Sequence, residues 1–214
     1  LQDKSDAYKY LFKDFDYAKQ FLKILVRPAE MLPNYEEFIY RCDFPNLLTF
    51  LVLDFEEQFK YIRNDSVIEW QVTDKELFEI AIENLSNENV EVKEYQFGDK
   101  FTVYILFNGD FSASYTLLLE EKLEFSIGAF GSLIAIPTKG TALIHPIETN
   151  EVLDLIEILY PLVQKFYIED PGSITLDFYW FYKRKYYMVD KTLDGERAIT
   201  IKLPKKLIEL FAKK

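Results

Sequence analysis

The chain has 214 residues, of which 49% are hydrophobic and 17% aromatic, and its formal net charge is −11. This length and apolar content predict a sizeable core and argue against long disorder. The charge is uneven, because residues 31–182 hold nine basic and twenty-seven acidic residues, whereas residues 183–214 hold ten basic and four acidic ones. An acidic body repels phosphate backbones, so we expect no nucleic-acid partner and favour a basic partner protein. The basic segments 183–185 and 205–206 are short and scattered, and we interpret them as solvated charge.

Cysteine usage and hydropathy indicate the compartment. Cys42 is the only cysteine, which excludes an intrachain disulfide and points to a reducing environment. We expect a buried or semi-exposed, inert thiol, since nucleophilic use would require a neighbouring base. The longest apolar run, residues 47–53, is far shorter than the ~20 residues that span a bilayer. A cytoplasmic protein with no membrane partner is therefore expected.

The first half of the chain predicts helices around one buried strand. Apolar residues recur at helical spacing over residues 8–27, which predicts a helix that ends before Pro28. Residues 47–53 are apolar at both odd and even positions, as in a strand covered on both faces. Residues 59–62 can form the strand that runs back beside it. Thr73 and Glu76 match a capping box and predict a helix after them.

The second half predicts mostly strands. Residues 90–96 and 101–108 favour a hairpin, and a helix over about 112–122 follows it. We expect short strands at 133–136 and 141–144, then a largely buried helix at 150–168 with Pro161 on its polar stripe. The last predicted elements are strands over 174–182, 186–189 and 198–203 and a helix over 205–213. Runs of strands with helices between them favour one compact α+β domain over residues 1–214, with an antiparallel or mixed sheet packed by several helices.

The turn at residues 109–114 is the main candidate for a site. Asp110, Ser112 and Ser114 lie where a strand ends and a helix begins, and free amides there can hold an anion. The alternative is that Asp110 or Ser112 is the N-cap of the helix. His145 is the only histidine, and it is either an acid or base of a site at this turn or a structural imidazole with a backbone partner. No residue is assigned a catalytic role on this pattern.

Other chemistry is weakly represented. One histidine and one cysteine leave no set of imidazole or thiolate ligands for zinc. The acidic groups 54/56/57 and 120/121/124 are typical of solvated faces, and residues 128–132 lack the spacing of a phosphate-binding loop. We expect neither a metal nor a cofactor.

Several short segments carry a family resemblance. Residues 48–50, 74–78, 108–114 and 134–137 resemble the bacterial DUF1444 family, also called the YtpQ or UPF0354 group, and the aromatic run Phe178-Tyr179-Trp180 is similar to a strand near the end of that family. The similarity spans about residues 45–190 and leaves the helices at 8–27 and 205–213 as additions. The family tends to carry an Arg-Asp pair where this chain has Thr138-Lys139-Gly140. The resemblance implies a bacterial origin, and because that family has no established activity, it implies no mechanism.

Two functions remain open. We favour a non-enzymatic protein-interaction or regulatory module with an acidic, aromatic-rich surface, of which an immunity- or inhibitor-like role is one form. The alternative is an enzyme or small-ligand-binding protein with its site at residues 109–114 near His145. A homo-oligomer that buries aromatic surface is a third arrangement compatible with the composition.

Overall fold

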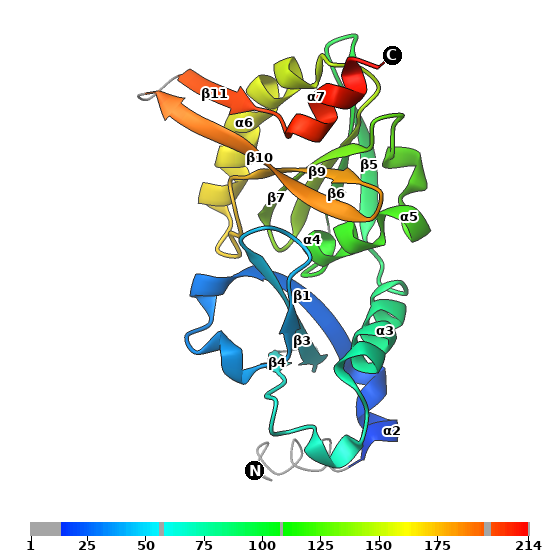
Figure 1. The fold of residues 1–214 in the computed structure, drawn as a ribbon. Coiled ribbons are helices and arrows are strands. Elements are labelled where there is room, and N and C mark those ends of the chain that lie inside the picture. Colours follow the sequence, from blue (N-terminus) through cyan, green and yellow to red (C-terminus); the bar gives the residue numbers. More distant parts are fainter. Residues whose placement is uncertain (1–13, 56–57, 108, 195–197, 214) are drawn as a thin grey trace. The chain divides into compact units, whose positions relative to one another are not determined.

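The computed structural model describes residues 14–55, 58–107, 109–194 and 198–213 (Figure 1). Helices and antiparallel strands occur together, which confirms the predicted α+β class. The sequence predicts one domain over residues 1–214, and the backbone contacts divide the chain into two compact units. Unit 1 runs up to residue 42 and continues over residues 47–88, and unit 2 comprises residues 43–46 and 89–214. Within the described ranges, no helix is both long and apolar enough to cross a bilayer.

The predicted helix over residues 8–27 is wrong in its second half. Residues 8–13 lie outside the described part, and helix α2 (Phe15–Ala18) and the 3-10 turn η1 (Lys19–Phe21) lead into strand β1 (Leu22–Pro28). The apolar residues of this segment fit the period of a helix and that of a strand equally well. Pairing decides between them, because every residue of β1 has an antiparallel partner in β3 (Leu47–Asp54).

Unit 1 is built on β3. This strand is buried from Leu47 to Leu53, as predicted for a strand covered on both faces. It pairs with β1 on one edge, and with β2 (Tyr40–Arg41) and β4 (Phe59–Tyr61) at different positions along the other. The remaining short turns of unit 1 are η2 (Ala29–Met31), η3 (Tyr35–Glu37) and η4 (Ile68–Trp70).

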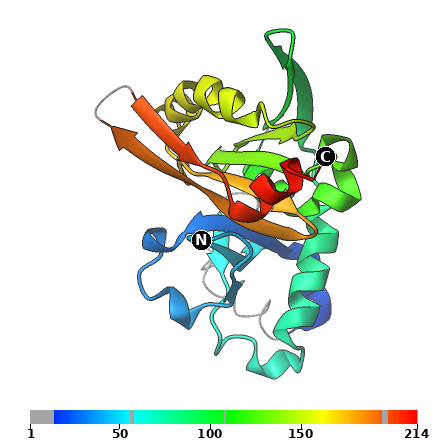
Figure 2. The same cartoon turned by 45° about the horizontal axis from the view of Figure 1, so that its top comes forward.

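Helix α3 (Asp74–Leu85) covers this sheet and runs alongside β1 (Figure 2). The capping box is confirmed, since the Glu76 amide donates to Thr73 Oγ1 and the Thr73 amide donates to the Glu76 carboxylate. The Thr73 amide and the Thr73 hydroxyl both donate to the Glu76 carboxylate and hold its pKa below its usual value. The buried face consists of Leu77, Phe78, Ala81 and Leu85, the stripe that the periodicity of this segment indicates.

Unit 2 contains a seven-stranded antiparallel sheet with the order β11-β10-β9-β7-β8-β6-β5 (Figure 1). The strands are β5 (Glu91–Phe97), β6 (Phe101–Phe107), β7 (Ser132–Thr138), β8 (Thr141–Pro146), β9 (Phe178–Tyr182), β10 (Lys185–Asp194) and β11 (Ala198–Lys202). The hairpin of β5 and β6 matches the prediction. Strand β5 is the exposed edge, and its hairpin extends beyond the rest of the sheet (Figure 2).

One face of this sheet packs on α6 (Val152–Glu169) and α7 (Lys205–Phe211). Their shared core contains Val103, Leu143 and Trp180 from the strands, Leu159 from α6 and Leu207 from α7. Helix α6 is less buried than predicted. Besides its polar stripe it exposes Leu153, Ile158 and Ile168.

The other face is covered by the segment between β6 and β7. This segment is not the single predicted helix but α4 (Ser112–Tyr115), η5 (Thr116–Leu118), α5 (Leu119–Lys122) and η6 (Glu124–Ser126). Side chains of the face opposite α6 contact it: the Tyr104 ring packs on Phe125, and the Tyr186 hydroxyl donates to the Thr116 carbonyl. The sheet of unit 2 is therefore a middle layer with two chemically separate faces.

Candidate functional site

The turn after β6 is held by contacts other than the predicted cap. Helix α4 begins after Phe111, which makes no side-chain capping bond, so the expectation that Asp110 or Ser112 is the N-cap is wrong. The Ala113 amide instead donates to the Lys139 carbonyl at 3.0 Å, which satisfies one of the free amides of the helix start. Asp110 Oδ1 lies 2.6 Å from Lys139 Nζ. The turn is thereby joined to the loop between β7 and β8.

The two serines of this turn are inaccessible. Ser112 and Ser114 are both 0% exposed, and among the described residues the Ser112 hydroxyl has no hydrogen-bond partner. An acyl or phosphoryl acceptor would have to reach one of these hydroxyls, and both are covered by protein. Their burial favours packing over nucleophilic chemistry.

His145 lies on the other face of the sheet. It is two residues from Leu143 in β8, so both side chains point towards α6, and its ring packs edge-on against Phe101 at 5.8 Å. Its Nδ1 lies 2.7 Å from the Thr102 carbonyl oxygen, so Nδ1 carries the proton. Burial lowers the pKa of His145, and the Thr102 contact and Glu148 oppose that effect only in part. This is the structural imidazole with a backbone partner that was one of the two predicted roles.

The structure does not bring His145 to Asp110, Ser112 and Ser114. The three turn residues lie next to Lys139, which is just before the start of β8. From Gly140 to His145 the chain advances about 17 Å along that strand. They also lie on the α4 side of the sheet, whereas His145 lies on the α6 side. Acid–base chemistry requires hydrogen-bond reach, which this arrangement does not provide.

The remaining titratable candidates are engaged or isolated. Arg184 binds Glu120 at 2.8 Å and Glu121 at 3.0 Å, so this acidic group forms an ion-pair network rather than a bare carboxylate cluster. Cys42 is a free, exposed thiol, so the expectation that it is buried or semi-exposed is wrong. In the described part of the chain, no three His, Cys, Asp or Glu residues come together in a way that could hold a metal ion; residues 56 and 57 lie outside that part.

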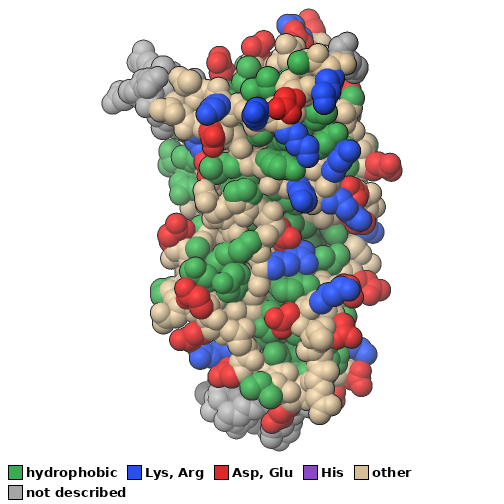
Figure 3. Space-filling model, viewed as in Figure 1, with side chains coloured by type: hydrophobic (Ala, Val, Ile, Leu, Met, Phe, Trp, Pro, Cys, Tyr) green, Lys and Arg blue, Asp and Glu red, His purple; other side chains and the backbone are tan. Residues whose placement is uncertain are grey.

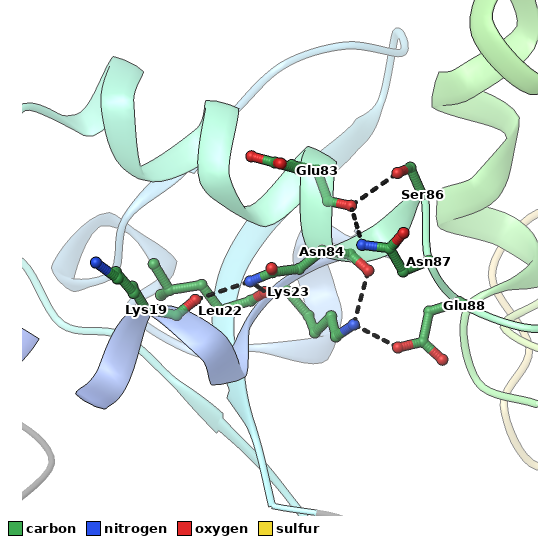
Figure 4. A network of polar contacts seen from close by, with 8 residues as sticks. All are labelled: Lys19, Leu22, Lys23, Glu83, Asn84, Ser86, Asn87 and Glu88. Atoms are coloured by element: carbon green, nitrogen blue, oxygen red, sulfur yellow. Dashed lines mark hydrogen bonds and ion pairs between the residues drawn. The ribbon is translucent and has the colours of Figure 1, made fainter. Parts of the chain in front are cut away.

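A polar network in unit 1 has a structural explanation (Figure 4). The Asn84 side-chain amide donates to the carbonyls of Lys19 and Leu22 at 2.8 and 2.9 Å, where η1 passes into β1. Lys23 donates to the Asn84 carbonyl at 2.9 Å and contacts the Glu88 carboxylate. These bonds satisfy carbonyls at the end of α3 and at the start of β1. They join the helix to the strand it covers.

An apolar groove opens on unit 2 beside α7. It has a volume of about 570 Å³, and α6, β11 and α7 contribute its walls. Its lining includes Leu153, Ile201, Lys202, Leu203, Ile208 and Phe211. Leu153 is 37% exposed and Ile208 is 51% exposed, so large apolar side chains at this groove are in contact with water.

A lysine cluster lies where α7 meets the turn between β9 and β10. Lys183 Nζ and Lys206 Nζ lie 5.5 and 5.3 Å from the centre of the Tyr182 ring, and Lys185 is the strand partner of Tyr182. Among the described residues, none of the three lysines has a carboxylate within 4.0 Å. Lys and Arg side chains gather over this part of unit 2 (Figure 3). The lysine cluster, defined as Lys183, Lys185 and Lys206, is a concentration of positive charge that the separate segments 183–185 and 205–206 did not indicate.

No family model, curated protein or solved structure matches this chain. The geometry of the two units is therefore the only basis for assigning a function. Among the described residues, the groove and the lysine cluster are two surface features of unit 2 that packing within the chain does not explain. The only sequence signal for them is the excess of basic residues after residue 182.

Proposed function

We propose that this protein is a non-enzymatic interaction module that binds a partner protein through the groove of unit 2. The exposure of Leu153 and Ile208 at the rim of an apolar groove carries this proposal. Single exposed apolar residues are common on proteins, but apolar side chains that gather around one groove are typical of interaction sites. An inhibitor- or immunity-like role is one form of such a function.

The lining of the groove favours a protein segment over a small polar substrate. Six of its eight lining residues are apolar, and the other two are Asn150 and Lys202. A groove of this kind receives apolar side chains of a helix or an extended segment, which bury their apolar area there. The resemblance to the DUF1444 group stays a prediction.

Substitution at the groove tests the proposal. Leu153→Glu and Ile208→Glu place a carboxylate on the apolar wall, and both should abolish capture of a stoichiometric partner from a lysate of the source organism. Ile168→Glu is the matched control, because Ile168 is 78% exposed on α6 but does not line the groove. Capture that is equal for all three variants, each shown to be folded by circular dichroism, would overturn the proposal.

A further inference from the structure

We propose that the groove and the lysine cluster together recognise an acidic amphipathic segment of the partner protein. The apolar side chains of that segment would occupy the groove, and its carboxylates would pair with the lysines. This inference rests on the proposed function, to which it adds the chemistry of the partner. It replaces the basic partner favoured by the overall charge with an acidic one at this surface.

The charges around α7 support an acidic partner. Lys183, Lys185 and Lys206 have no carboxylate within 4.0 Å in the described part of the chain. The chain as a whole has a net charge of −11, so unneutralised lysines grouped on one surface are the exception. Charge complementarity at the rim of an interface steers association and selects the partner.

Helix α7 connects the two features. Leu207 is fully buried and anchors the helix to the core, while Ile208 and Phe211 line the groove. Lys206, on another side of the same helix, reaches Tyr187 and Tyr182 of the sheet, with Nζ 3.3 Å from the Tyr187 hydroxyl oxygen. A segment that lies across this short helix meets apolar side chains on one flank and ammonium groups on the other. An amphipathic helix presents those two properties on its two faces.

The same contacts argue against nucleic acid as the occupant. Bases bind on free aromatic faces, and the Tyr182 ring is stacked on Trp180 at 5.1 Å with an interplanar angle of 16°. The ammonium groups of Lys183 and Lys206 also lie near that ring. A phosphate backbone would bury none of the aliphatic surface of the groove, and the acidic body of the protein would repel it.

The experiment uses the full chain and synthetic peptide probes. One probe is an amphipathic helical peptide with glutamates on one face and leucines on the other, and its counterpart carries lysines in place of the glutamates. Binding is followed by fluorescence anisotropy for the wild type, Lys183→Glu, Lys206→Glu and Ile208→Glu. Lys93→Glu is the control, because Lys93 is also an exposed lysine over an aromatic ring, 4.4 Å from the centre of Phe107 on the β5–β6 hairpin, but its Nζ has a carboxylate, that of Glu91, at 3.7 Å.

We expect the acidic probe to bind and the basic probe not to bind. Each charge reversal at the lysine cluster should lower the affinity for the acidic probe by about tenfold, because an attraction becomes a repulsion. Ile208→Glu should also abolish binding, and Lys93→Glu should leave it within about twofold. Raising the salt concentration from about 50 to 500 mM should weaken wild-type binding and remove most of the difference between the lysine variants and the wild type.

Other outcomes overturn the inference in distinguishable ways. Loss of partner capture by Ile208→Glu with no effect of Lys183→Glu or Lys206→Glu would leave the proposed function standing and exclude an acidic partner. Binding of a poly-dT oligonucleotide that the lysine variants abolish and Ile208→Glu does not change would identify a nucleic-acid surface instead. Concentration-dependent self-association in sedimentation velocity, lost in the same variants, would make a second copy of this chain the occupant. Absence of any effect at both features would remove the proposed function as well.

Discussion

At the scale of single residues, burial and backbone geometry determine what each candidate can do. The Nδ1 proton of His145 is directed at the Thr102 carbonyl, burial lowers the pKa of this ring, and Ser112 is enclosed in packed protein. Both residues are of types that can act in catalysis, but neither is placed where a substrate can reach a second reactive group. Their roles follow from the layers that cover them.

His145 should make the stability of the protein depend on pH. Because its folded pKa lies below the usual value near 6.5, the unfolded chain binds more protons at this residue as the pH falls through that region, and stability is lost on acidification. In His145→Asn the amide keeps a donor for Thr102 and removes the titration. The difference in unfolding free energy between wild type and variant should therefore be larger at about pH 7.5 than at about pH 5.

Urea denaturation at the two pH values measures this difference. Titration of the wild type by NMR provides the independent check. A His145 pKa at or above its usual value, or a cost of His145→Asn that does not change with pH, would contradict the prediction.

Gly131 is the glycine whose replacement should be most damaging. Its φ of +88° disfavours any side chain, and a Cβ there would lie 2.0 Å from the Phe181 carbonyl oxygen, a backbone atom that cannot turn aside. Gly98 has a φ of +61° and nothing within 4 Å of the same position. Gly98→Ala should thus show the backbone strain alone, about 1–2 kcal/mol, and Gly131→Ala should cost well beyond that. Thermal unfolding of the two variants compares them, and equal losses would contradict the steric argument.

At the scale of elements, pairing partners decide between a helix and a strand where periodicity is ambiguous. Residues 22–28 become a strand because β3 lies beside them with seven matched partners. Where local signals agree with the tertiary context, the expectation holds, as with the capping box of Thr73 and Glu76 and the hairpin of β5 and β6. The segment at 112–122 is interrupted because it follows the face of the sheet and begins without a side-chain cap.

The junction between α3 and β1 should depend on Asn84. Asn84→Ala removes two hydrogen bonds to the carbonyls of Lys19 and Leu22, which should cost about 2 kcal/mol. Asn87→Ala is the matched control, because its single bond to the Glu83 carbonyl is exposed and 3.2 Å long, and its loss should cost under about 0.5 kcal/mol. Chemical denaturation measures both. Equal costs would mean that the network in Figure 4 does not hold the strand to the helix.

At the scale of the whole molecule, the chain order and the compact units do not coincide. Residues 43–46 are flanked on both sides by unit 1 but belong to unit 2. Phe44 is 2% exposed and packs against Tyr179 and Tyr186, and the Tyr179 hydroxyl donates to the Pro45 carbonyl at 3.2 Å. Unit 2 therefore takes part of its core from a segment far from it in sequence.

Phe44→Ala should loosen unit 2 before unit 1. Truncation of a buried phenylalanine typically costs about 3–5 kcal/mol, and the cavity would adjoin β9 and β10. Hydrogen exchange followed by mass spectrometry should show faster exchange over residues 178–189 than in the wild type, with residues 47–53 less affected. Leu51→Ala is the complementary variant, because it truncates a fully buried side chain of β3. It should speed exchange over residues 47–53 more than over residues 178–189. Identical exchange patterns for the two variants would contradict the assignment of residues 43–46.

The sequence by itself determined the α+β class, the buried strand at 47–53, the α3 cap and the second-half order of elements. These follow from local patterns, because periodicity and capping act within a few residues. The strand at 22–28, the membership of residues 43–46, the separation of His145 from Ser112, and the lysine cluster were decided only by the tertiary structure. Each of these depends on which face of a sheet a residue occupies or on contacts between residues distant in sequence, and no local pattern carries that information. Lys183 and Lys206 are the clearest case, since only the docking of α7 on the sheet places both beside the Tyr182 ring.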